Sequence, residues 1–144
     1  MNLYWFSFVL TVASNVGYHF FQKEIQPDAP PFFSLAASYL VGLITTLIII
    51  VLFPKLNGSV GWKGIEKVGW ASYGLGFALV GLELGFLLAY RAGWKISFAA
   101  LVCNIGVTLI LIPIGFFAYR ESLTPSKGVG VILSLAGLWL LAKK

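Results

Sequence analysis

Five runs of about 20 mostly apolar residues follow one another along the chain, separated by proline, glycine and charged residues. A helix of about 20 apolar residues spans the roughly 30 Å hydrocarbon core of a bilayer. In lipid the backbone has to satisfy its own hydrogen bonds, which a helix does. The pattern therefore predicts an all-α polytopic membrane protein with five transmembrane helices and one transmembrane domain over residues 1–144. The approximate spans are 3–22, 32–53, 70–90, 96–118 and 127–142.

The composition supports lipid as the solvent. Hydrophobic residues make up 59% of the 144, charged residues only 10%, and the mean hydropathy is +0.91, whereas a soluble domain carries about 25% charged residues. The net charge of +5 comes from basic residues scattered singly between apolar runs, which does not indicate a nucleic-acid partner. One histidine, His19, and one cysteine, Cys103, are too few for a four-ligand zinc site. We expect a multi-pass protein of the cytoplasmic (inner) membrane with no metal or cofactor.

The basic residues are divided evenly between the two sides of the predicted bundle. Lys and Arg in short loops favour the cytoplasmic side, so a protein with one fixed orientation normally shows a bias. The side of the N-terminus would hold Lys55, Lys63, Lys67, Arg120 and Lys127, and the opposite side Lys23, Arg91, Lys95, Lys143 and Lys144. This balance favours dual topology, in which copies insert in both senses. The alternative is that the long, partly amphipathic loop around Trp62 sets a single orientation.

Glu83 is the one acidic side chain inside a predicted span. The other four acidic residues fall in predicted loops: Glu24, Asp28, Glu66 and Glu121. At helical spacing Glu83 shares a face with Tyr73 and Tyr90. Ionisable side chains within a span usually face the bundle interior or a water-filled cavity, and a carboxyl in a low dielectric takes up a proton more readily than one in water. Glu83 is therefore predicted to couple proton movement to transport or to bind a cation. Two alternatives are a neutral carboxyl that forms a hydrogen bond with the backbone of a neighbouring helix, and a side chain that extends to the membrane interface.

Further polar side chains lie on single faces of the first and fourth spans. Asn15, Tyr18 and His19 follow one face of the first, and Asn104 lies within the fourth. If these faces converge with Glu83, the bundle encloses a polar chamber of the kind that binds small molecules. The alternatives are interhelical hydrogen bonds for Asn15 and Asn104 and an interfacial or packing role for His19. Trp94, beside Lys95, is either an aromatic wall or a headgroup anchor.

The C-terminal third, FFAYRESLTPSKGVGVILSLAGL over residues 116–138, has a bulky run, a glutamate before Leu-Thr, and a helix with glycine near its start and again at Gly137. It resembles the end of an EamA-like repeat of the drug/metabolite transporter superfamily. The segment from Ala89 to Gly93, followed by small polar residues, is similar to the same repeat. Full-length members carry two five-helix repeats in inverted topology. The resemblance thus implies a single-repeat chain that works as an inverted dimer, either a homodimer or a pair with a sister protein.

Small multidrug resistance proteins are four-span relatives, and the segment from Met1 to Gly17 looks superficially similar to their start. Their coupling glutamate would fall at Ser14 in an ungapped alignment, so that residue is absent here. This departure, together with the fifth span, puts efflux by their mechanism in doubt unless Glu83 has taken over the task.

Together these features predict secondary-active transport of a small metabolite or amphipathic solute by alternating access, with the site near the bilayer midplane. Glu83 would be the coupling or cation-binding acid. The walls or gates would be Tyr73, Tyr90 and Trp94, and the hydrogen-bond partners Asn15, Tyr18 and Asn104. The expected partners are the small-molecule substrate, membrane lipid and a second protomer.

Two alternatives stay open: a non-transporting membrane scaffold or partner subunit, and a lipid-chain flippase. No enzyme is expected, because the chain shows no paired carboxylates, nucleophile elbow, metal-ligand spacing or phosphate loop.

Dual topology predicts that C-terminal reporters are active on both sides of the membrane. A fusion to a cytoplasmically active fluorescent protein and a fusion to a phosphatase active only outside should both give signal. The control is the same pair of fusions with two lysines added to the loop around Trp62, which should shift the signal to one side. Signal from only one reporter in the unchanged chain would reject dual topology.

Overall fold

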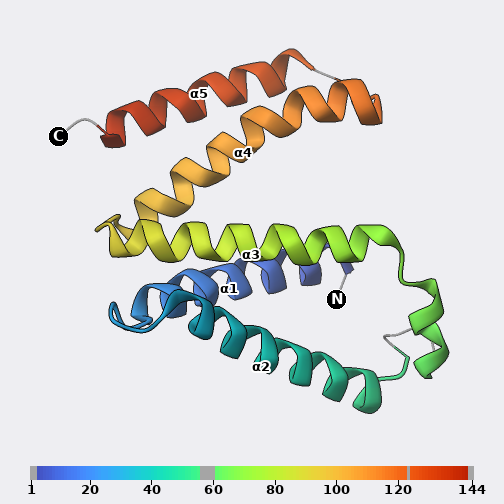
Figure 1. Cartoon of the computed structure of the whole chain (residues 1–144). Helices are drawn as coiled ribbons and strands as arrows, with labels where there is room; N and C mark the ends of the chain where they lie inside the picture. The colour runs from blue at the N-terminus through green and yellow to red at the C-terminus, as the bar shows by residue number, and fades with distance from the viewer. Residues whose placement is uncertain (1–2, 56–60, 123, 143–144) are drawn as a thin grey trace. The chain divides into compact units, whose positions relative to one another are not determined.

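The computed structural model describes residues 3–55, 61–122 and 124–142, and they form a helical protein (Figure 1). The helices are α1 (Leu3–Glu24), α2 (Pro31–Leu52), α3 (Trp70–Arg91), α4 (Ile96–Tyr119) and α5 (Pro125–Ala142), with a short 3-10 helix η1 (Gly61–Lys67) before α3. No strand occurs in these ranges. The all-helical prediction is confirmed, and each predicted span falls on one of the five long helices.

Three helices, α2, α3 and α4, are long and apolar enough to cross a membrane among the residues described. The chain is therefore a membrane-embedded helical protein. Membrane crossing by α1 and α5 stays a prediction: Asn15 and His19 interrupt the apolar run of α1, and α5 has only 18 residues. Leu123, Lys143 and Lys144, which entered the sequence interpretation, lie outside the described residues.

Local sequence signals set the helix ends. Pro30 precedes α2 and Pro31 occupies its first turn, where the missing N–H of proline would have no intrahelical partner in any case. Gly93 has φ +90° in the turn between α3 and α4, a conformation that glycine adopts without steric cost. At the end of α4, Arg120 is left-handed and its backbone N–H donates to the Gly115 carbonyl. Pro113 lies inside α4, which continues through it.

The contacts of the chain divide it into two compact units, Phe21–Arg91 and Met1–Phe20 with Ala92–Lys144. In the first unit α2 packs against α3, and in the second α4 packs against α5. The division passes through α1, whose last residues belong with α2 and α3.

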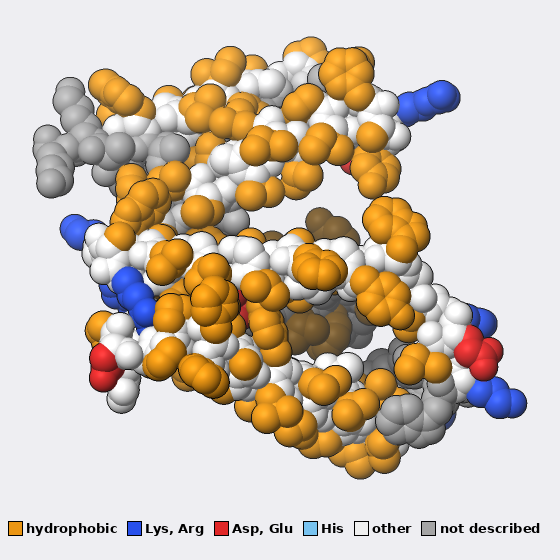
Figure 2. Space-filling model, viewed as in Figure 1, with side chains coloured by type: hydrophobic (Ala, Val, Ile, Leu, Met, Phe, Trp, Pro, Cys, Tyr) orange, Lys and Arg blue, Asp and Glu red, His pale blue; other side chains and the backbone are white. Residues whose placement is uncertain are grey.

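Few apolar side chains are buried, and most of the large ones are exposed. Figure 2 shows hydrophobic side chains along the helices, with basic side chains mainly near helix ends. Exposure of such a surface to water would be unfavourable, whereas contact with the equally apolar lipid tails carries no free-energy penalty. The buried apolar residues among those described are Leu35, Phe86, Leu87, Tyr90 and Ala99.

Leu87→Ala tests this small core. Leu87 is 1% exposed, so its truncation leaves a cavity and should lower the free energy of unfolding in detergent by about 2 kcal/mol or more. The matched control is Leu88→Ala on the same helix turn, because Leu88 is 50% exposed and lipid or detergent fills the space left by truncation. Equal thermal stability of the two variants would contradict the packing of α3.

Candidate functional site

Within Phe21–Arg91, the end of α1, the start of α2 and the end of α3 lie together (Figure 1). Buried side chains from two of these helices, Leu35, Leu87 and Tyr90, form the apolar part of this end. The ring of Phe86 stacks on Tyr90 with centroids 6.0 Å apart. The packed end therefore holds the C-terminal half of the face that carries Glu83.

Polar side chains tie the end of α1 to α3. The Gln22 side-chain amide donates to the Glu83 backbone carbonyl at 2.7 Å, and Gln22 is itself buried. The Lys23 ammonium donates to the Tyr90 carbonyl at 3.3 Å and lies 5.6 Å from the centroid of the Tyr90 ring. The last carbonyls of a helix have no intrahelical donor and favour cations. The Lys23 contact thus satisfies a carbonyl in the last turn of α3, and both contacts join α3 to α1.

Arg91 fixes the connection between α1 and α2. Its Nη2 donates to the backbone carbonyls of Ala29 at 2.6 Å and Gln26 at 3.2 Å. The sequence analysis used Lys23 and Arg91 only to count the charges in loops, whereas in the structure both side chains donate hydrogen bonds that hold helix ends and a loop together. Their position directly at predicted span ends could have indicated this role.

Glu83 lies at the border between the packed and the open part of α3. It is half-buried and precedes Arg91 by eight residues, or about 12 Å along the helix. Towards the C-terminus its face is buried at Leu87 and Tyr90, whereas towards the N-terminus Tyr73 is 66% exposed. No Lys or Arg side chain described in the structure forms an ion pair with Glu83. The carboxyl is thus an acid without a fixed counter-ion at the edge of a small core.

Tyr39 of α2 is the residue near Glu83 that the sequence interpretation missed. Its hydroxyl is buried and has no hydrogen-bond partner in the described part of the chain. The Glu83 carboxyl is close enough to act on it electrostatically. The Ser and Thr side chains of α2 instead donate to carbonyls four residues earlier in their own helix, as Ser38 and Thr45 do. Tyr39 differs from these side chains because a tyrosine hydroxyl cannot reach a carbonyl of its own helix turn in this way. A tyrosine within this apolar helix was the sequence feature that could have indicated a polar site.

The predicted partners on α1 lie in the other unit, with residues 1–20. Asn15 is exposed, and His19 is buried with its ring edge-on to Tyr18 at 5.1 Å. Trp94 follows the turn after α3 and contacts Phe98, with ring centroids 5.8 Å apart. The polar chamber that would join these residues to Glu83 stays a prediction.

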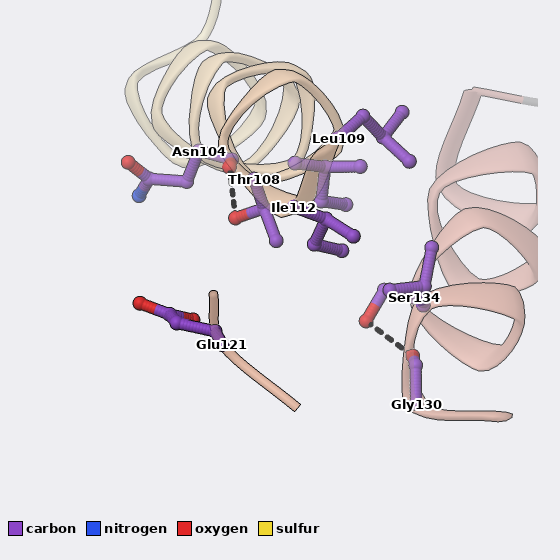
Figure 3. Close-up of a pocket in the computed structure, with 9 residues that line it drawn as sticks. Asn104, Thr108, Leu109, Ile112, Glu121, Gly130 and Ser134 are labelled. Carbon is purple, nitrogen blue, oxygen red and sulfur yellow. Dashed lines mark hydrogen bonds between the residues drawn. The ribbon is translucent and has the colours of Figure 1, made fainter. Parts of the chain in front are cut away.

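Asn104 lines a groove of about 500 Å³ between α4 and α5. The groove also contains Glu121, which directly follows α4, and side chains of α5 (Figure 3). The sequence interpretation placed Glu121 in a loop, and its carboxyl folds back over Gly115 of α4, where a Cβ would lie 3.0 Å from Oε2. A glycine six residues before Glu121 was the available sequence signal. Among the described residues, no three His, Cys, Asp or Glu side chains are grouped to hold a metal ion.

Comparison with models of known families, with curated proteins and with solved structures finds no match to the chain. The resemblance to an EamA-like repeat therefore stays a prediction that rests on the residues quoted for it.

Proposed function

We propose that this chain is a secondary-active carrier of the cytoplasmic membrane. It moves a small metabolite or amphipathic solute by alternating access, and Glu83 exchanges the coupling proton. The observation that carries the proposal is a half-buried carboxyl on a helix able to cross a membrane, near a buried and unsatisfied phenol on the neighbouring helix. Ionisable groups inside membrane helices commonly mark proton relays or ion pathways.

The pair of Glu83 and Tyr39 offers a physical route for coupling. In the proposed cycle an ionised Glu83 carboxylate would accept a hydrogen bond from the Tyr39 hydroxyl, which has no partner among the described residues. A protonated carboxyl is neutral and has a donor of its own, so it holds the phenol less strongly. Proton uptake would thereby weaken one contact between α2 and α3, which otherwise pack through apolar side chains such as Leu35 and Leu87.

Alternating access in this proposal uses two copies in opposite orientations, as the even division of basic residues favours. The exposed apolar faces of the helices supply surface for such a pairing. They would equally suit a scaffold subunit that binds another membrane protein, so the decisive property is transport by the purified chain alone.

Glu83→Gln should abolish substrate-driven proton flux, because an amide keeps the shape of the side chain but cannot exchange a proton. Purified protein is reconstituted into liposomes that contain a pH-sensitive dye, and a panel of small amphipathic amines, acids and neutral solutes is added outside. We expect flux with at least one solute and a loss of at least about tenfold in the variant. Glu24→Gln, at an exposed acid at the end of α1, is the matched control. Equal flux in Glu83→Gln and the unchanged protein would overturn the role of Glu83, and no flux with any solute would favour the scaffold.

Tyr39→Phe separates coupling from packing. Loss of an unsatisfied buried hydroxyl should leave the thermal stability equal or higher, so a stability change alone would not report on function. We expect the proton flux to fall about threefold or more, because the hydroxyl that would donate to the ionised Glu83 carboxylate during the proposed cycle is absent. Tyr119→Phe, at an exposed tyrosine at the end of α4, is the control and should leave that rate unchanged. Normal flux in Tyr39→Phe would remove Tyr39 from the mechanism.

A further inference from the structure

The groove between α4 and α5 combines an apolar lining with polar side chains. Its apolar walls come from Ile105, Leu109 and Ile112 of α4 and Val131 of α5. Asn104, Thr108, Glu121 and Ser134 supply the polar groups, and Figure 3 shows them around one open space. The volume of about 500 Å³ lies within the range of small-molecule sites.

The hydroxyl groups of this groove present acceptors rather than donors. The Thr108 hydroxyl donates to the Asn104 backbone carbonyl at 2.7 Å, and the Ser134 hydroxyl donates to the Gly130 carbonyl at 2.9 Å. Because a hydroxyl has one proton and two lone pairs, each oxygen keeps an acceptor for a ligand. A ligand that donates hydrogen bonds fits this arrangement, and an anion does not.

Glu121 adds a negative charge at one side of the groove. Its backbone N–H donates to the Gly115 carbonyl at 3.0 Å, which fixes the residue beside the end of α4. The absence of a side chain on Gly115 lets the carboxylate lie against the helix, since a Cβ there would be 3.0 Å from Oε2. Among the side chains that the structure describes, none forms an ion pair with Glu121. Its charge is thus available to a cation.

We propose that this groove binds a primary ammonium group carried on a small apolar body. The ammonium has three N–H donors, for which the groove offers acceptors in the Glu121 carboxylate and in the hydroxyl oxygen of Thr108 or Ser134. The apolar body contacts the aliphatic walls between α4 and α5. The site lies in a different unit from Glu83, so this inference goes beyond the proposed function and does not depend on it.

Binding is tested with phenethylammonium on the purified full chain in detergent micelles, by equilibrium dialysis at neutral pH and low salt. Phenethyl alcohol, which has the same apolar body without the charge, corrects for partition into the micelles. We expect saturable binding of the ammonium and at least about tenfold weaker binding by Glu121→Gln, which corresponds to about 1.4 kcal/mol. Glu66→Gln, at an exposed acid of η1, should bind like the unchanged protein.

Gly115→Ala tests the geometry without removing the charge. The added Cβ forces the Glu121 carboxylate to move, and we expect about threefold or more weaker binding. Gly106→Ala is the matched control on the same helix, because its Cβ would meet no atom within 4 Å, and both changes favour the helix. Absence of saturable binding, or equal affinity in Glu121→Gln and the unchanged protein, would overturn the proposal. Since no proton gradient is used, such a result would leave the transport test of Glu83 intact.

Discussion

The structure depends on the need of the backbone to form its hydrogen bonds within each helix, because lipid offers no partners. The chain meets this requirement with five long helices joined by short connections and one 3-10 helix. Once the backbone is satisfied, lipid solvates the apolar side chains, so no extensive core is needed. The few buried side chains, such as Leu35, Leu87 and Ala99, follow directly from this constraint.

Besides the small apolar core, polar contacts join the ends of the helices. Gln22 and Lys23 reach the carbonyls of α3, and Arg91 reaches those of the connection before α2. In the other unit, Glu121 returns to the end of α4 through a backbone hydrogen bond and a contact on Gly115. Interhelical hydrogen bonds in membranes contribute only about 0.6 kcal/mol on average, so each of these contacts is individually weak.

The two acids beside these contacts have different surroundings and suit different tasks. Glu83 is half-buried on α3, which packs against the helix that carries the buried Tyr39 hydroxyl. Glu121 is exposed beyond the end of α4 and lines the groove together with Thr108 and Ser134. The proposed transport cycle and the proposed ammonium site therefore rest on two different acids.

The sequence by itself determined the helical class and the helix ends to within about two residues, because apolar runs and the breakers Pro31, Gly93 and Pro125 act locally. It also identified Glu83 as the acid inside a span and placed Asn15, Tyr18 and His19 on one face of α1. Only the tertiary structure decided which side chains meet: Gln22 with the Glu83 carbonyl, Tyr39 near the Glu83 carboxyl, and Glu121 on Gly115. The physical reason is that helical periodicity fixes the face on which a side chain lies, whereas its partner depends on how separate helices pack. Where most residues of the helices are apolar, the local sequence gives little indication of that packing.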